Sequence, residues 1–323
     1  MKVGIAGCGF MGEVHATNYK KLGLEIYAIA EKNKSRSDRF AQKFSPVKRY
    51  SDIAGMISDK EVEIIDICLP TPFHGAATTE ALKQNKHVLL EKPVTLSLEE
   101  AEAIKKVKAL STGKFMVAHV LRFWPQYTII RKLFEQKKLE NVKEVYASRI
   151  NELPLWSEDT WIMNEEKSGG IIIDLMIHDI DFLLWNLGKV KRVWSKGIPN
   201  NRGFHIQVLA ILEFENGTVA YIEGSYLNPF GAGLDSQMRI YGEKAKAEMY
   251  SNENKIKYVK DGGIEKKLEA PKIDGYFKEI SYFVDCIKND REPYIITLED
   301  AIESLKVCLG LYNSLKSGKW INI

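Results

Sequence analysis

Glycines near the start of the chain have the spacing of a phosphate-binding loop. The apolar run Lys2–Ala6 leads into a G-x-G-x-x-G pattern, and helix-forming residues follow it. In such a loop the first glycine allows a tight turn, the second lets the backbone approach a pyrophosphate, and the third lets the helix pack on the strand. The helix N-terminus then offers N–H groups to phosphate. The pattern predicts a dinucleotide site formed by Gly7, Gly9, Phe10, Met11 and Gly12.

An acidic residue, Glu31, follows the second apolar run, Leu24–Ala30. A carboxylate near this offset from the glycines reaches the adenosine ribose hydroxyls and repels the 2′-phosphate of NADP. Glu31 therefore favours NAD as the cofactor. Three cations come directly afterwards and keep NADP open as the alternative: Lys32, Lys34 and Arg36.

Two polar residues in an apolar, helix-forming stretch have the chemistry of a proton relay. Asp174 and His178 lie four positions apart within Ile171–Trp185, so a helix places them on one face. A histidine oriented by a neighbouring carboxylate is a suitable general base for alcohol oxidation. A buried structural pair is the alternative interpretation of this spacing.

A lysine follows another apolar run, within Glu91-Lys92-Pro93. Proline biases the preceding residue toward an extended conformation, which would aim Lys92 off the end of a strand. An ammonium group there can stabilise alkoxide character in a transition state. The alternative interpretation is an ordinary solvent-facing lysine.

The elements that must position these groups alternate over residues 1–120. Fully apolar strands between amphipathic helices indicate a parallel sheet covered on both faces, with the ligand at the carboxyl ends of the strands. Strands are predicted at Val3–Ala6, Glu25–Ala30, Ile64–Leu69, His87–Leu90 and Phe115–Ala118. Helices are predicted near Glu13–Lys21, Ser35–Phe44, Ile53–Ser58, Ala76–Gln84 and Leu98–Leu110, the last opened by a Ser97/Glu100 capping box.

After Arg122, strand patterns follow one another without intervening helices. They are Glu144–Ile150, Gln207–Phe214, Val219–Ser225, Gln237–Tyr241, Ala247–Tyr250 and Lys255–Val259. Helical patterns accompany them at Ile171–Trp185, Tyr276–Lys288 and Leu298–Leu315, with Thr297 and Asp300 capping the last. The predicted fold class is an α/β Rossmann domain (doubly wound parallel sheet, 1–120) followed by an α+β domain with a large open, mostly antiparallel sheet (121–323).

The strand Gln207–Phe214 has apolar residues on both faces, since Val208, Ala210 and Leu212 alternate with Leu209 and Ile211. A sheet that is apolar on two sides cannot be left bare to water. The sequence therefore predicts a homodimer or homotetramer joined through this sheet, in the domain that also binds substrate.

Composition narrows the choice of partners and compartment. The 323 residues are 45% hydrophobic and carry a net charge of only +3, and no block of consecutive basic residues predicts a nucleic-acid partner. The most apolar segment, Gly169–Leu187, contains Asp174, His178, Asp179 and Asp181, so no membrane association is expected. No His, Cys and carboxylate cluster has metal-ligand spacing, and the four separated cysteines fit reduced thiols in the cytoplasm.

Several motifs together resemble one known family. After the glycine loop with His15-Ala16 come Pro70-Thr71-Pro72-Phe73-His74, Glu91-Lys92-Pro93, Arg122-Phe123-Trp124-Pro125, Trp161, and the stretch from Gly169 to Asp181. In order and spacing they resemble the glucose–fructose oxidoreductase / inositol dehydrogenase (Gfo/Idh/MocA) family over nearly the whole chain. The resemblance implies a Rossmann domain, an open-sheet domain, and oxidation or reduction of a sugar-like carbinol with NAD(P).

The resemblance also implies residue roles. Lys92, Asp174 and His178 match the family's catalytic residues, and Pro70, Thr71, His74 and Glu91 are expected beside the cofactor. Lys92, Arg122, Trp161, Asp174 and His178 are expected to bind the substrate; an interface arginine and a core tryptophan are the alternatives for Arg122 and Trp161. One departure is Met176, where the family usually has glycine; it is expected to shape the pocket and puts substrate identity in doubt.

The leading hypothesis is therefore an NAD-dependent dehydrogenase that moves a hydride between NAD(P) and a secondary-alcohol carbon of a sugar, polyol or sugar derivative. A second hypothesis is an NADP-dependent reductase of a nucleotide-linked or deoxy sugar. A third, from another class, is a non-catalytic dinucleotide-binding regulatory protein.

Overall fold

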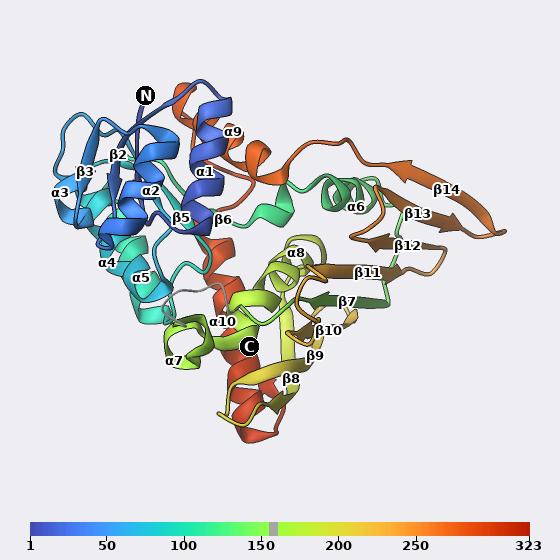
Figure 1. Cartoon of the computed structure of the whole chain (residues 1–323). Coiled ribbons are helices and arrows are strands. Elements are labelled where there is room, and N and C mark those ends of the chain that lie inside the picture. The colour runs from blue at the N-terminus through green and yellow to red at the C-terminus, as the bar shows by residue number, and fades with distance from the viewer. Residues whose placement is uncertain (155–160) are drawn as a thin grey trace. The chain divides into compact units, whose positions relative to one another are not determined.

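The computed structural model describes residues 1–154 and 161–323, which divide into two compact units (Figure 1). The first comprises Met1–Phe123 and Asp274–Ile302, and the second comprises Trp124–Ile273 and Glu303–Ile323. The sequence predicts one domain over 121–323, whereas in the structure the segment Asp274–Ile302 returns to the first unit.

The cause of that return is helix α9 (Gly275–Lys288). Its buried Ile280, Phe283 and Val284 belong to the same hydrophobic core as Ala16 and Tyr19 of helix α1 (Phe10–Lys21). Positions 280, 283 and 284 lie on one face of α9, because residues three and four apart are neighbours on a helix. This apolar face packs on α1. Sequence periodicity predicts the helix but not which core it joins.

The first unit contains a six-stranded parallel sheet in the order β3-β2-β1-β4-β5-β6. Its strands are β1 (Lys2–Ala6), β2 (Glu25–Ala30), β3 (Lys48–Tyr50), β4 (Ile64–Ile67), β5 (His87–Glu91) and β6 (Phe115–Ala118). The order reverses at β1, where an open sheet of this kind binds its ligand. Only the short, exposed edge strand β3 was not predicted.

Helices connect these strands as predicted. They are α1, α2 (Lys34–Phe44), α3 (Ile53–Ile57), α4 (His74–Lys83) and α5 (Leu98–Lys108), with short 3-10 turns at Thr71–Phe73 and Val120–Arg122. The predicted cap of α5 is confirmed, because the Glu100 backbone N–H donates to Ser97 Oγ over 3.2 Å. Capping satisfies a backbone donor that the first helical turn would otherwise leave unpaired.

The second unit contains a nine-stranded sheet in the order β14-β13-β12-β11-β7-β10-β9-β8-β15. All neighbours are antiparallel except β7 and β10. Its strands are β7 (Glu144–Ile150), β8 (Val190–Pro199), β9 (His205–Phe214), β10 (Val219–Ser225), β11 (Asp235–Tyr241), β12 (Ala245–Tyr250), β13 (Lys255–Lys260), β14 (Ile264–Glu269) and β15 (Ile321–Asn322). The predicted open, mostly antiparallel sheet is confirmed.

Helices cover one face of this sheet. The helices of this unit are α6 (Pro125–Glu135), α7 (Glu165–Ser168), α8 (Ile177–Leu187) and the part of α10 (Leu298–Ser317) from Glu303 onward. A 3-10 turn, Trp161–Met163, and a π-helical turn, Ile172–Met176, precede α7 and α8. Contacts across this face include Ser195 Oγ of β8, which donates to the carbonyl of Leu311 in α10 over 2.7 Å.

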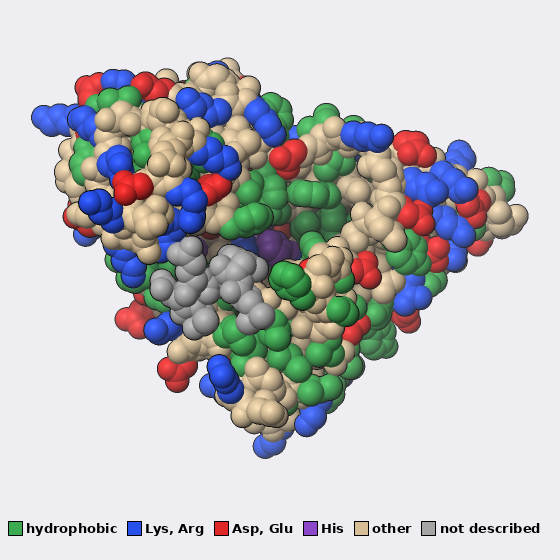
Figure 2. All heavy atoms as spheres, viewed as in Figure 1, with side chains coloured by type: hydrophobic (Ala, Val, Ile, Leu, Met, Phe, Trp, Pro, Cys, Tyr) green, Lys and Arg blue, Asp and Glu red, His purple; other side chains and the backbone are tan. Residues whose placement is uncertain are grey.

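Charges of both signs are interspersed over the β12–β14 end of this unit, as Figure 2 shows. Ion pairs there include Lys246–Glu248 at 2.8 Å and Lys257–Glu265 at 3.3 Å. In the part of the chain that the structure describes, no helix is both long enough and apolar enough to cross a membrane.

Candidate active site

The glycine loop has the close packing that its sequence predicts. Gly7 has a φ of +92°, and a Cβ there would lie 2.5 Å from the carbonyl oxygen of Cys68. A Cβ on Gly12 would lie 2.0 Å from the carbonyl oxygen of Gly7, so only glycine lets α1 approach the loop this closely. A Cβ on Gly9, by contrast, would meet no protein atom within 4 Å. Gly9 therefore borders open space rather than the packed interior.

Helix α1 begins at Phe10 in this open space. Its N-cap is Gly9, and no side chain caps the first turn. Phe10 is 64% exposed, and Met11 is half-buried. The uncapped helix N-terminus has the partial positive charge and the inward-pointing N–H groups that bind phosphate. The loop thus fits the pyrophosphate of a dinucleotide.

Glu31 lies directly after β2, and its carboxylate is held from three sides. Oε2 accepts the backbone N–H of Cys8 over 3.0 Å, and Oε1 accepts that of Asn33 over 2.9 Å. The guanidinium Nε of Arg36 lies 3.2 Å from Oε2. These contacts fix the carboxylate beside the glycine loop, where it fits the adenosine ribose. Arg36, one of the three cations that kept NADP open, faces this carboxylate.

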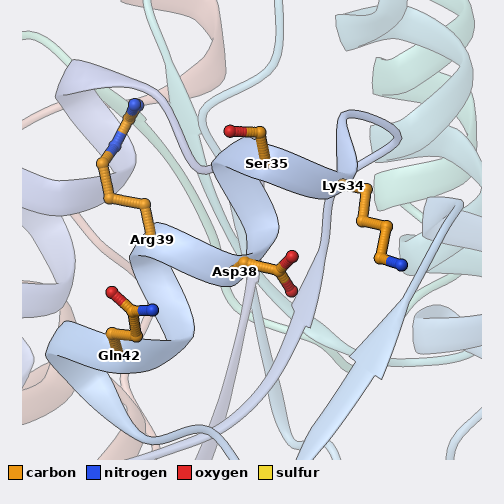
Figure 3. Close-up of a pocket in the computed structure, with 5 residues that line it drawn as sticks. All are labelled: Lys34, Ser35, Asp38, Arg39 and Gln42. Atoms are coloured by element: carbon orange, nitrogen blue, oxygen red, sulfur yellow. The ribbon is translucent and has the colours of Figure 1, made fainter.

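Lys34, another of those three cations, lines a shallow hollow on α2 (Figure 3). Its lining is Lys34, Ser35, Asp38, Arg39 and Gln42. In Figure 3 these side chains point away from the helix in different directions instead of converging. Asp38 is also ion-paired with Arg49. The hollow therefore lacks the geometry of a phosphate site.

Lys92 directly follows β5, at the carboxyl edge of the parallel sheet, and is half-buried. Its backbone N–H donates to Glu91 Oε2 over 3.1 Å, and the Lys92–Pro93 peptide bond is cis. Glu91 is 8% exposed. Burial raises its pKa, but the hydrogen bond and charge of His15 outweigh burial, so the pKa of Glu91 lies below its ordinary value. Glu91 is therefore a carboxylate that supports the backbone at Lys92.

His74 supports the same backbone from the other side. The ring is 1% exposed; Nδ1 lies 2.7 Å from the Pro93 carbonyl oxygen and Nε2 lies 2.8 Å from that of Leu69. Burial lowers the pKa of His74. Thr71, 4% exposed, opens the 3-10 turn that precedes α4, while Pro70 is half-buried. His74 thus connects the turns after β4 and β5 rather than presenting its ring at the surface.

Asp174 and His178 are the residues of the second unit that the sequence singled out. Within residues 171–180, all of which the structure describes, only these two side chains are partly exposed, and the other eight are buried. Asp174 lies in the π-helical turn and His178 in the first turn of α8. π-Helical turns inside helices occur often at functional sites. The predicted shared face of Asp174 and His178 is therefore the one that reaches solvent.

Tyr226 is a partner of Asp174 that sequence reasoning missed. Its hydroxyl donates to Asp174 Oδ2 over 2.7 Å, and its ring stacks on Phe204 at a centroid distance of 6.0 Å. Burial, followed by the Asp174 charge, raises the pKa of Tyr226 well above its ordinary value. The tyrosine is therefore a fixed hydrogen-bond donor. It follows β10 directly, but no local pattern connects it with a residue 52 positions earlier.

Met176, at the position where the family usually has glycine, does not reach solvent. Its side chain is 0% exposed and packs on β10 where Gly224 lacks a side chain. A Cβ on Gly224 would lie 2.4 Å from Met176 Cγ. The methionine that replaces the family's usual glycine is thus accommodated by a glycine on the neighbouring strand.

Two buried acids of α8, Asp179 and Asp181, anchor this helix to neighbouring elements. Asp179 accepts from Arg149 of β7 through Nε over 2.8 Å and Nη2 over 3.0 Å, and Tyr127 of α6 accepts from the same Nη2 over 2.9 Å. Asp181 accepts from Ser304 Oγ over 3.1 Å. Despite burial, the Asp179 charge raises the pKa of Arg149, so this is a buried ion pair. These anchors fix the helix that carries His178.

Arg122 has partners within its own unit. It is 2% exposed, and Nη1 donates to the Ile295 carbonyl over 2.7 Å and to Asp300 Oδ2 over 3.1 Å. This geometry favours a structural role over substrate contact. Trp161 is half-buried in its 3-10 turn.

One group among the described residues has the donor types of a metal site: His15, Asp66 and Cys68. His15 Nδ1 lies 2.9 and 3.0 Å from the two Asp66 oxygens, which is the separation of a hydrogen-bonded ion pair. Because this contact already uses the nitrogen that would face a metal, the group fits a charge cluster better than a metal site. All four cysteines are free thiols.

Comparison with known proteins agrees with this geometry. The model of an oxidoreductase family with an NAD-binding Rossmann fold matches residues 1–119. The chain is thus an NAD(P)-dependent oxidoreductase. A second model, the GFO/IDH/MocA C-terminal domain, matches residues 127–248, and the chain belongs to this family.

Similar proteins include two curated enzymes and a solved structure. The scyllo-inositol 2-dehydrogenase (NAD(+)) of Bacillus subtilis is 26% identical over 98% of this chain and 95% of its own length. The myo-inositol 2-dehydrogenase of Thermotoga maritima is 25% identical over 100% of this chain and 98% of its own. The structure of scyllo-inositol dehydrogenase from Lactobacillus casei with NAD(H) and scyllo-inositol superposes with a TM-score of 0.86 at 23% identity, covering 100% and 98%. The fold is therefore shared along the whole chain.

Proposed function

We propose that this chain oxidises a secondary alcohol of a cyclic polyol or a closely related sugar, with NAD as the preferred hydride acceptor. The observation that carries the proposal is the exposure of Asp174 and His178 alone on a buried ten-residue stretch. Both side chains are therefore within reach of a small molecule that approaches this helix. Its relatives that act on inositols support the choice of substrate class.

We assign each residue the role that its chemical type and its place in the fold support. Bound NAD accepts the hydride, and the glycine loop and Glu31 hold the dinucleotide. His178 takes the hydroxyl proton as general base. Asp174, fixed by Tyr226, orients the reacting polyol or the imidazole. Lys92 donates a hydrogen bond to the reacting oxygen and stabilises its developing negative charge.

A substrate panel tests the function. Purified protein is incubated with NAD⁺ or NADP⁺ and cyclic polyols, linear polyols, aldoses and 1,5-anhydro sugars, and formation of the reduced cofactor is followed by absorbance. We expect turnover with NAD⁺ and at least one cyclic polyol. Turnover restricted to NADPH and a keto or deoxy sugar would favour the reductase hypothesis. Tight NAD binding without turnover of any of these compounds would favour a regulatory protein.

The same proposal includes assembly and location. An aromatic and apolar row crosses the uncovered face of the nine-stranded sheet, where Trp194 pairs with Ile211, Ile211 with Tyr221, and Tyr221 with Tyr146. This row supports a homodimer or homotetramer joined through the sheet. Four free thiols support a cytoplasmic location.

A further inference from the structure

A histidine outside the substrate-facing helix lies between two buried carboxylates of the first unit. His15 of α1 is 0% exposed. Its Nδ1 contacts Asp66 at 2.9 Å, and its Nε2 lies 3.2 Å from Glu91 Oε1. Asp66 lies in β4 and Glu91 at the end of β5, so one imidazole bridges two neighbouring strands.

The Nε2 contact with Glu91 is at ion-pair distance, and the carboxylates on both sides of the ring favour its doubly protonated form. A neutral imidazole donates from one nitrogen only, whereas each nitrogen of His15 faces an acceptor-only carboxylate. Burial lowers the pKa of His15, but the charge of Asp66 and its hydrogen bond outweigh burial and hold the pKa well above its ordinary value. His15 is therefore an imidazolium between two anions.

Other titratable groups complete the surroundings. Cys68 Sγ lies 3.2 Å from Asp66 Oδ1 and 3.6 Å from His15 Nδ1, and burial raises its pKa well above the ordinary value. Burial, followed by the charge of Asp66, raises the pKa of Tyr19 well above its ordinary value. From α9, the Tyr276 ring lies 6.3 Å from the His15 ring, and Glu279 adds negative charge near both tyrosines. Tyr19, Tyr276 and Cys68 remain neutral near neutral pH, so the cluster's charge comes from His15 and the carboxylates.

The cluster ends at Lys92. While Glu91 Oε1 faces His15, Glu91 Oε2 accepts the backbone N–H of Lys92 over 3.1 Å. On the other side of Lys92, the carbonyl of Pro93 is held by His74. The residues before and after Lys92 are thus each fixed by a buried imidazole.

We infer that His15 is a positioning residue for Lys92: its charge holds Glu91 in place, and Glu91 fixes the backbone from which the Lys92 ammonium extends. The inference rests on the proposed function only for the catalytic role of Lys92. Without the imidazolium, Glu91 has no buried cation opposite it and is free to attract the Lys92 ammonium. Misplacement of a catalytic group by about 1 Å costs on the order of 100-fold in rate.

The test compares His15→Gln with His87→Gln, since His87 lies at the opposite end of the same strand, β5. We expect His15→Gln to lower kcat roughly 10- to 100-fold with an unchanged Kd for NAD. The deficit should grow as the pH rises through the carboxylate pKa of Glu91, because only the ionised carboxylate attracts Lys92. Adding Glu91→Gln to His15→Gln should remove this pH dependence and restore part of kcat.

Charge state is read independently of turnover. In NMR spectra of protein labelled at the histidine nitrogens, both ring nitrogens of His15 should remain protonated at about pH 8, above the ordinary histidine pKa. A neutral His15 ring at that pH would overturn the inference even if no substrate is found. A kcat deficit that stays constant with pH, or that equals the His87→Gln deficit, would reduce His15 to a packing role. If the wild-type protein turns over none of the substrates in the panel, the proposed function is refuted. The NMR measurement of the His15 charge still stands in that case.

Discussion

At the scale of single residues, Glu31 links cofactor choice to a neighbouring cation. Its carboxylate is fixed by two backbone N–H groups, and it also neutralises Arg36. The 2′-phosphate of NADP would have to approach the Glu31 carboxylate, while the guanidinium of Arg36 is already paired with that carboxylate. The geometry therefore favours NAD through repulsion by Glu31 and through the occupation of Arg36.

Glu31→Ser should reverse or narrow that preference. The substitution removes the anion and releases Arg36 toward a 2′-phosphate, so the ratio of Kd for NADP to Kd for NAD should fall roughly tenfold or more. Fluorescence titration at fixed ionic strength measures both constants. As a control, Arg36→Ala in the Glu31→Ser background should cancel the gain for NADP. A wild-type protein that prefers NADP would contradict the assignment.

His178 and Lys92 are predicted to serve one reaction. His178→Ala should reduce kcat by roughly 10²- to 10⁴-fold, the usual value of general acid–base catalysis. Lys92→Ala should cost a comparable factor by removing charge stabilisation at the reacting oxygen. Neither should change the Kd for NAD, because we propose that the glycine loop and Glu31 hold the dinucleotide.

The double variant His178→Ala/Lys92→Ala shows whether the two side chains act on one step or have independent roles. If both side chains act on the same hydroxyl, the two losses combine less than additively. Asp174→Asn should also lower kcat and shift the acid limb of its pH profile. A His178→Ala enzyme with near wild-type turnover would move the role of base to Lys92 and leave Asp174 and His178 with substrate positioning.

At the scale of elements, α8 depends on a buried ion pair. The side chains of Arg149 and Asp179 are 5% and 1% exposed, and they join α8 to β7. Asp179→Asn leaves the guanidinium buried without its anion, which should cost about 3–5 kcal/mol of unfolding free energy. Urea denaturation monitored by circular dichroism measures the loss.

A surface pair of the same geometry provides the control for this prediction. Arg192 also forms a bidentate contact, with Glu213 at 2.7 and 2.8 Å, but solvent screens it. Glu213→Gln should therefore shift the urea midpoint far less than Asp179→Asn does. Equal shifts of the urea midpoint would mean that burial does not determine how much the Arg149–Asp179 pair contributes to the free energy of unfolding.

Elements with regular periodicity were predictable, and contacts between distant elements were not. The predicted bounds of the strands Glu144–Ile150 and Val219–Ser225 are confirmed, and buried residues alternate with more exposed ones over most of Val219–Ser225. Strand β8 (Val190–Pro199) was missed because glycine, proline and charged residues interrupt its pattern. The sequence singled out Lys92, Asp174 and His178 as candidates, but Tyr226 and the partners of His15 are brought near by tertiary folding alone. The sequence likewise could not show that Gly224 accommodates Met176.

At the scale of the whole molecule, the nine-stranded sheet presents two different faces. Val208, Ala210 and Leu212 are at most 2% exposed beneath the helices of the unit, whereas Leu209 on the opposite face is 52% exposed. Tyr221, on the neighbouring strand, is 41% exposed on that same face. The uncovered face therefore carries the apolar row that we propose as the subunit contact.

Tyr221→Lys should break the proposed assembly. A lysine in the middle of the row would have to be buried against a second copy without a counter-ion, so sedimentation at micromolar concentration should show a smaller species. Circular dichroism should remain unchanged, because the residue lies on the uncovered face. Ile264→Lys is the matched control, since Ile264 is also exposed but lies on β14 at the edge of the sheet. A wild-type monomer would refute the assembly.

The return of Asp274–Ile302 to the first unit has a consequence for biosynthesis. A ribosome releases the six strands of the parallel sheet early, but Ile280, Phe283 and Val284, which complete that core, emerge only after the entire nine-stranded sheet except β15. The surface of α1 in the nascent Rossmann unit therefore stays uncovered while about 150 further residues are translated. At ordinary rates of translation this takes on the order of ten seconds. During that interval α1 is a surface for chaperones to protect, and a gene cut after residue 123 would encode a unit that lacks part of its own core.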